Sequence, residues 1–107
     1  MLEPHPATIA TSSQTSSEVQ ANGLLIAGVI TDPAMSSTSF TFYGAVQSGG
    51  PYYRISDGAG SALTKTFVAG DYVPLEPYLF AGVNFLQAKG NATEAATRTL
   101  QFMVKAA

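Results

Sequence analysis

Short runs of alternating apolar and polar residues most constrain how this chain of 107 residues can fold. In residues 37–47, Phe40, Phe42 and Val46 fall on one face of an extended backbone, and Thr, Tyr, Ala and Gln fall on the other. A period of two residues is typical of a β-strand with one buried side. We therefore expect Phe40, Phe42 and Val46 to lie in a core.

Similar short segments recur along the chain between turns that contain glycine or proline, and no segment has convincing helical periodicity. The expected strands or extended segments are residues 17–20, 24–30, 37–47, 52–55, 63–68, 72–75, 83–89 and 98–104. In the last of these, Leu100, Phe102 and Val104 are expected to point inward. The pattern predicts an all-β fold, an antiparallel two-sheet β-sandwich, with a jelly roll as one topology that it allows.

Turn residues refine this prediction at two places. The dipeptide Asn22-Gly23 predicts a tight turn after the first short strand. Pro74 and Pro77 cannot donate a backbone hydrogen bond, so the stretch to residue 80 should be an edge or a crossing connection. One helical turn is expected at residues 77–80.

The first 22 residues differ in composition from the rest, because Ser, Thr, Ala, Gln and Pro dominate them. This predicts an extended N-terminal arm with a first short strand at residues 1–22 and a β-sandwich domain at residues 23–107. So polar a segment gains little from burial, whereas ordering it costs roughly 1–2 kcal/mol per residue. We therefore expect a partner outside the arm to hold it.

Charged residues make up 11% of the sequence, against about 25% in an ordinary soluble domain. A surface with so little charge suggests that another protein covers much of it, and so an assembled, structural role. A secreted or Ser/Thr-rich lineage could have the same composition. The net charge is −2 and the basic residues are scattered, so we expect no direct nucleic-acid binding.

The longest apolar run, residues 24–30, has the length of a strand, so we expect no membrane span. The first ten residues lack the charged start and apolar stretch of a secretory signal, which predicts that the protein is made in the cytoplasm and used without export.

Catalytic chemistry is not indicated. The chain has no cysteine, and its single histidine, His5, lies between two prolines. Asp32, Asp57 and Asp71 each stand at a turn, where Asp is favoured for its own backbone hydrogen bonds. We expect no catalytic residue, no cofactor and no metal site.

The five tyrosines allow two interpretations. They fit a protein interface, because a wide ring with a polar tip buries area at low entropic cost. They could also form a stacking platform for a sugar. The candidate partner-binding residues, from the expected arm and the tyrosines, are Thr8, Ile9, Thr11, Gln14, Tyr52, Tyr53 and Tyr72.

A set of short motifs carries a resemblance over about residues 19–104. The motifs are LLIAGVI at 24–30, SFTF at 39–42, DGAG at 57–60, PLEP at 74–77, FAGVNFL at 80–86 and RTL at 98–100. In this order they resemble small virion structural proteins of tailed bacteriophages, among them the head decoration or cement proteins. Those proteins are β-sandwiches that sit outside the capsid and join neighbouring major capsid subunits. The family has no catalytic motif.

The resemblance implies a non-enzymatic virion protein on the phage head exterior that stabilises the shell by protein–protein interaction. Its partner would be the major capsid protein, and a homo-oligomer, dimer or trimer, would match the symmetry axes of a shell. The arm would lie over a neighbouring subunit. The alternative is a tail or fibre-associated module that binds a carbohydrate or receptor.

Overall fold

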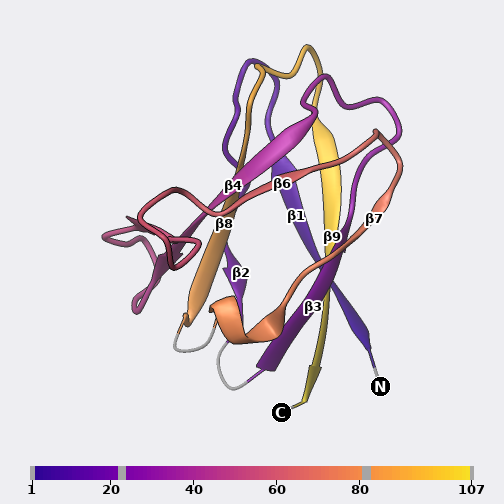
Figure 1. Cartoon of the computed structure of the whole chain (residues 1–107). Helices are drawn as coiled ribbons and strands as arrows, with labels where there is room; N and C mark the ends of the chain where they lie inside the picture. Colours follow the sequence, from indigo (N-terminus) through magenta and orange to yellow (C-terminus); the bar gives the residue numbers. More distant parts are fainter. Residues whose placement is uncertain (1, 22–23, 81–82, 107) are drawn as a thin grey trace.

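The computed structural model describes residues 2–21, 24–80 and 83–106, drawn in colour in Figure 1. Within these ranges it contains nine β-strands and one short 3₁₀ helix. The strands are β1 (Glu3–Ile9), β2 (Val19–Gln20), β3 (Leu24–Ile30), β4 (Ser39–Ala45), β5 (Tyr53–Arg54), β6 (Thr64–Thr66), β7 (Tyr72–Pro74), β8 (Phe85–Gly90) and β9 (Arg98–Ala106), and the helix is η1 (Pro77–Phe80).

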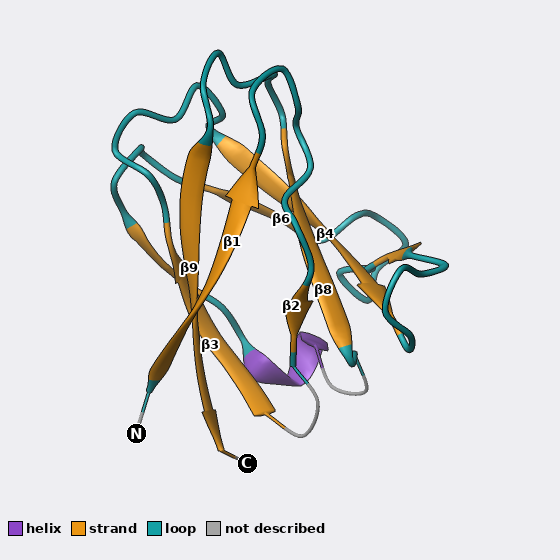
Figure 2. Ribbon diagram, turned by 180° about the vertical axis from the view of Figure 1, so that it is seen from behind, coloured by secondary structure: helices purple, strands orange, loops and turns teal. Residues whose placement is uncertain are grey.

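The strands form two antiparallel sheets that pack face to face (Figure 2). The first, here called sheet A, has the order β1-β9-β3-β7. The second, sheet B, has the order β2-β8-β4-β5, and β6 also pairs with β4. The predicted all-β, antiparallel two-sheet sandwich is thus confirmed.

The strand order is that of a jelly roll, in which a chain folded double is wound into two sheets. The first strand pairs with the last, β2 pairs with β8, and β3 pairs with β7. In the middle of the chain, β4 pairs with both β5 and β6. Because every outer pair joins distant parts of the sequence, the fold closes only when both ends of the chain are in place.

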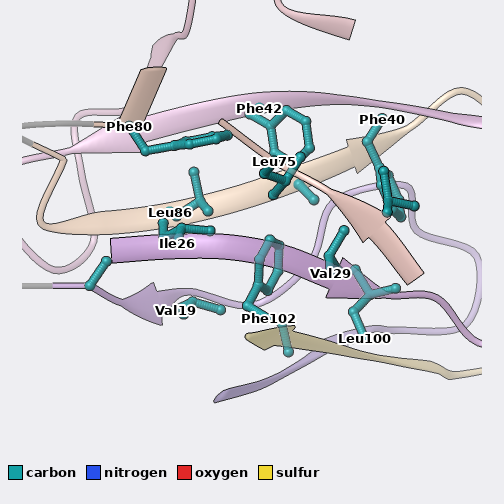
Figure 3. Packing of buried hydrophobic residues seen from close by; sticks show 14 of the residues in the cluster. Val19, Ile26, Val29, Phe40, Phe42, Leu75, Phe80, Leu86, Leu100 and Phe102 are labelled. Carbon is teal, nitrogen blue, oxygen red and sulfur yellow. The ribbon is translucent and has the colours of Figure 1, made fainter. Parts of the chain in front are cut away.

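The core lies between the sheets and contains residues from both (Figure 3). Phe40 and Phe42 of β4 are fully buried, as are Leu100, Phe102 and Val104 of β9, which confirms these inward positions. The Phe42 ring meets Phe80 of η1 edge to face, with centroids 5.4 Å apart. The helical turn predicted at residues 77–80 is therefore present, and it fills one end of the core.

Three local expectations are refined. Val46 was expected in the core but is 64% exposed, because β4 ends at Ala45 and the alternation stops there. The segments 52–55 and 63–68 supply only the short strands β5 and β6, which pair with opposite ends of β4. The turn expected at Asn22-Gly23 lies outside the described residues.

The expected N-terminal arm at residues 1–22 is wrong, because most of this segment belongs to the sandwich. All seven residues of β1 pair with β9, in a register that runs from Glu3 opposite Val104 to Ile9 opposite Arg98. Ala7 and Ile9 are buried in the core. The backbone hydrogen bonds and burial that order this segment come from the C-terminal strand of the same chain, which composition cannot reveal.

Residues 15–17 join the two sheets along one side of the sandwich. The Ser17 amide donates to the Thr8 carbonyl at 2.8 Å, and the Thr8 amide donates to Ser17 Oγ at 3.0 Å. Ser16, next to Ser17, donates its amide to the Ala88 carbonyl of β8 at 2.8 Å. The free edge of β1 and the part of β8 that extends beyond β2 are thereby covered by residues of the same chain.

On the other side, an ion pair joins β6 to the segment between β7 and η1. Lys65 Nζ lies 2.9 Å from Glu76 Oε2 and donates to Oε1 at 3.0 Å. The hydrogen bond from Lys65 is the main reason that the pKa of Glu76 lies below its usual value. Both sides of the sandwich are therefore held by polar contacts, which in a sheet protein protect the edges from foreign strands.

Proline protects the free edge of β1. The two hydrogen bonds with Ser17 show that the backbone of Thr8 faces away from β9, so the backbones of Pro4 and Pro6 face the same way by alternation. Proline has no N–H, and the Thr8 N–H is already bonded to Ser17. This edge therefore offers carbonyl acceptors at residues 4 and 6 and no free donor, so it is a poor template for another strand.

Replacing both prolines should open this edge. In the double variant Pro4→Thr/Pro6→Thr, two new N–H donors point outward, and we expect self-association through β1 to increase. Size-exclusion chromatography with light scattering should show a higher mean mass than for the original chain at equal concentration. Pro33→Thr, at a loop proline, is the control and should leave the mass unchanged; equal masses for all three proteins would contradict this function of the prolines.

Candidate interaction surface

The outward face of sheet A is the candidate interaction surface. Residues opposite one another in antiparallel strands point to the same face, so the strand register identifies the outward set. Pro6 lies opposite Gln101, which lies opposite Ile30, which in turn lies opposite Tyr72. We use the name sheet A face for the part of this surface that ends at Met103, and its residues are Pro4, Pro6, Thr8, Gly28, Ile30, Tyr72, Pro74, Thr99, Gln101 and Met103.

The sheet A face carries no charge. Each of its ten residues is apolar, a hydroxyl or an amide. Beyond Met103 the outward row of β9 continues with the exposed Lys105, which lies opposite Leu25, so the charge-free area ends there. Ile30 is 38% exposed and Tyr72 is 46% exposed, so large apolar groups lie open to solvent. On sheet B, the charged Lys89 lies among the outward residues, opposite Thr41. The ten residues of the sheet A face therefore form a charge-free area that Lys105 borders at one end.

Tyr72 lies flat on this surface because Gly28 leaves room for it. A Cβ atom at position 28 would lie 2.6 Å from Cζ of Tyr72, closer than any real contact. Gly28 also follows the register shift between β3 and β9. The glycine thus lets an aromatic ring cover the backbone of β3 and keeps the face smooth.

A buried carboxylate fixes one end of the sheet A face. Glu94, in the link between β8 and β9, is fully buried. Its Oε1 accepts hydrogen bonds from the Ser36 amide at 2.8 Å and from Arg98 Nε at 3.1 Å. Its Oε2 accepts from the Ser37 amide at 3.0 Å and from Ser37 Oγ at 2.9 Å. One side chain therefore joins the start of β9 to the link that follows β3.

The backbone of the same residue holds the end of β1. The Ser12 amide donates to the Glu94 carbonyl at 2.8 Å, and the Glu94 amide donates to the Ser13 carbonyl at 3.0 Å. Ser12 has a positive φ of 67°, in the left-handed region that is uncommon for residues other than glycine. Three strands of the sheet A face, β1, β9 and β3, are thus tied together at the end of the sandwich opposite the termini (Figure 1).

Glu94 is held in its charged form. Desolvation by burial alone would raise its pKa, but the hydrogen bonds from the Ser36 amide, the Arg98 guanidinium and Ser37 together keep that pKa below its usual value. Sequence reasoning missed this residue, because Glu94 stands in a small polar loop that reads as exposed. The one sequence signal for its role was Arg98, a basic residue four positions later that pairs with Glu94.

A second carboxylate fixes the loop between β4 and β5. Glu18 accepts hydrogen bonds from Ser48 Oγ at 2.7 Å, from the Gly49 amide at 2.6 Å and from the Tyr52 hydroxyl at 2.5 Å. The bond from Tyr52 is the main reason that the pKa of Glu18 is lowered. Burial, followed by the bond to Glu18, raises the pKa of Tyr52. The Tyr52 hydroxyl is therefore engaged within its own chain.

The sequence-predicted partner residues do not form one cluster. Thr8 and Tyr72 lie on opposite edges of the sheet A face. Ile9 was predicted to contact a partner, but it is fully buried in the core, so this prediction is wrong. Its neighbour Thr8 points outward instead, because successive side chains of a strand alternate.

The remaining predicted residues lie elsewhere. Thr11 Oγ1 lies 3.3 Å from Thr97 Oγ1, and the Gln14 carbonyl accepts a hydrogen bond from the Gly90 amide at 2.9 Å. Tyr53 is on β5 of sheet B, whereas Tyr72 is on β7 of sheet A. Tyr52, Tyr53 and Tyr72 therefore do not make a common stacking platform for a sugar.

Two features are absent from the described residues. Among them, no three His, Cys, Asp or Glu side chains come together in a way that could hold a metal ion. In the same parts of the chain, no helix has the length and apolar character needed to cross a membrane.

Comparison with known proteins gives one useful likeness. No protein-family model matches the chain, and no curated protein matches its sequence. The fold is similar to that in a crystal structure of the SPBc2 prophage-derived protein YomS, with a TM-score of 0.60. The match covers 97% of this chain and 94% of that one, at 14% sequence identity. The likeness therefore shows a shared fold over the whole domain.

The Glu94 contacts predict a pH-dependent stability. Because the folded state lowers the pKa of Glu94 below the usual value of 4.5, its contribution is complete above that pH and is lost as the pH falls further. The variant Glu94→Gln leaves Arg98 without its buried partner and should lower the free energy of unfolding at pH 7 by about 3 kcal/mol.

Urea denaturation followed at pH 7 and at pH 3.5 would measure this. The loss of stability between the two pH values should be smaller for Glu94→Gln than for the original chain. Glu3→Gln, at an exposed position of β1, is the matched control and should behave like the original chain. If the original chain, Glu94→Gln and Glu3→Gln all lost the same stability between the two pH values, the function assigned to Glu94 would be contradicted.

Proposed function

We propose that this protein is a non-enzymatic structural component of a phage virion, and that it decorates the capsid by placing the sheet A face on major capsid subunits. The observation that carries the proposal is the uncharged sheet A face, whose strands the Glu94 contacts hold in fixed positions. Two findings support it. Jelly rolls occur widely in viral capsid domains, and the fold is shared with a prophage-derived protein.

The area of the face suits a partner assembly that presents the same binding surface many times. Four strands about 4.8 Å apart and three rows of outward residues cover roughly 400 Å². A standard protein interface buries about 800 Å² on each partner, so one such contact alone would be weak. A decoration protein that contacts several capsid subunits, or that forms a dimer or trimer on the shell, would gain the missing affinity through avidity.

The rigidity of the face supports the same conclusion. Association costs less when the contacting side chains and strands are ordered in advance. Proline at positions 4, 6 and 74 restricts the backbone of both edge strands, and Gly28 fixes the place of the Tyr72 ring. A small face can then bind with little loss of conformational entropy.

A single charge placed on the sheet A face tests the proposal. Gln101 is exposed at the centre of the face on β9, so Gln101→Glu should introduce a carboxylate that the interface must bury without a partner. We expect at least a tenfold loss of retention on purified phage heads stripped of the protein. Gln20→Glu, at an exposed position of β2 in sheet B, is the matched control and should bind like the original chain.

Retention would be measured by co-sedimentation with heads and, in parallel, with purified tails. Equal retention of both variants on heads would exclude the sheet A face as the interface. Binding to tails and not to heads would exclude capsid decoration and favour a tail or fibre module. Circular dichroism of each variant would show that the sandwich is still folded.

A further inference from the structure

We propose that two free copies of this protein pair with each other through the sheet A face, with the strands of the two copies antiparallel. Lys105 of each copy then lies against the loop end of the second copy, where Asp32 stands. Such a contact has two-fold symmetry and is closed, so it makes a dimer and does not polymerise. It differs from a dimer or trimer on the shell, which would leave the sheet A face on the capsid.

Opposite charges border the two ends of the sheet A face. Near the termini, Lys105 lies opposite Leu25 in the outward row and is exposed. At the other end, the partly exposed Asp32 lies beside Thr99, whose amide donates to Asp32 Oδ2 at 3.2 Å. Neither charged side chain forms an ion pair with another residue that the structure describes. The surface therefore has a positive end, an uncharged centre and a negative end.

The spacing of these charges fits an antiparallel pairing. Thr99 and Lys105 are six residues apart on β9, so the two charged ends are about 20 Å apart. A two-fold axis that crosses the strands between Gln101 and Met103 places Lys105 of one copy over Thr99 of the other, beside Asp32. Packed sheets lie about 10 Å apart, a gap that a lysine side chain and a carboxylate together can close. Both ends of the contact are then matched in charge.

The same charges disfavour the other two-fold arrangement, in which the axis runs along the strands. There the like ends meet, so the two Lys105 side chains approach each other at one end and the two Asp32 side chains at the other. Like charges repel and opposite charges attract, so the charge pattern selects the antiparallel arrangement. The surface is thus complementary to a second copy of itself, which is the reason for choosing that occupant.

The area of the face sets the strength of the pairing. At roughly 400 Å² per copy, the dimer buries about 800 Å² in total, whereas stable complexes bury about 1,200–2,000 Å². We therefore expect a transient dimer with a dissociation constant of roughly 0.1–1 mM. One consequence, which rests on the proposed function, is that free copies cover their binding face until a shell with many sites displaces the second copy.

NMR spectra of the isotope-labelled full chain at increasing concentration test the pairing. Between about 20 μM and 2 mM, a range that brackets the expected dissociation constant, the amide resonances of Ile30, Gln101 and Met103 should shift. The amides of Thr41 and Gln87, on the outward side of sheet B, should stay in place. No shift over this range would exclude the dimer, and shifts confined to sheet B would exclude the sheet A face as its interface.

Lys105→Glu tests the charged contact. An exposed ion pair contributes little by itself, but this variant turns attraction into repulsion at both ends of the dimer, so we expect about tenfold weaker pairing. Lys89→Glu, at an exposed cation of sheet B, alters the net charge equally and is the matched control, which should pair like the original chain. Equal weakening by both variants would indicate general repulsion between copies and contradict the contact.

A second substitution tests the antiparallel arrangement. Thr99→Lys puts an ammonium group at an exposed position of the loop end, opposite position 105 of the second copy, and keeps the backbone bond to Asp32. The double variant Lys105→Glu/Thr99→Lys should therefore regain an affinity within about threefold of the original. If the like ends met, the two new carboxylates would still face each other, so a double variant as weak as Lys105→Glu would overturn this arrangement.

Two further measurements keep the interpretation clear. Circular dichroism of each variant would show that the sandwich is folded. The pairing experiments contain no phage heads, so a chain that stays monomeric at about 2 mM would overturn the pairing alone. Failure of the Gln101→Glu test on heads would overturn the capsid contact alone.

Discussion

The buried Glu94 carboxylate is the interaction on which the arrangement of the loops depends. A buried charge is costly unless hydrogen bonds and an opposite charge replace water, and Glu94 has both. Its four side-chain hydrogen bonds come from two segments, and its backbone is bonded to a third. The charge is satisfied only when the two segments that bond the carboxylate are in place, and the backbone bonds add the segment after β1. Glu94 therefore favours one arrangement of this end of the sandwich.

The topology explains why the first residues belong to the domain although they look like an arm. In a chain folded double, the first strand can pair only with the last, and β1 lies beside β9 over its whole length. The information that orders β1 is therefore nearly a hundred residues away in the sequence. Within the segment itself, the alternation of Ala7 and Ile9 with polar neighbours is too short to be distinguished from a polar linker.

The features that sequence does predict are those set by local chemistry. Alternation identifies the inward residues of β4 and β9, because the period of a strand depends only on its own backbone. Proline identifies η1 and the edge strand β7, because its missing N–H excludes it from the interior of a sheet. The register of sheet A and the environment of Glu94 depend on contacts between distant segments, so the uncharged face could be expected from composition but not placed.

The sheet edges show how such a small domain could take part in an assembly without polymerising through them. Residues 15–17 and the prolines deny a foreign strand the donors it needs at β1, and Pro74 removes a donor from β7. Association must then use surfaces that side chains make specific. On the proposed function, the ten residues of the sheet A face supply such a surface, because their side chains point outward from all four strands of sheet A.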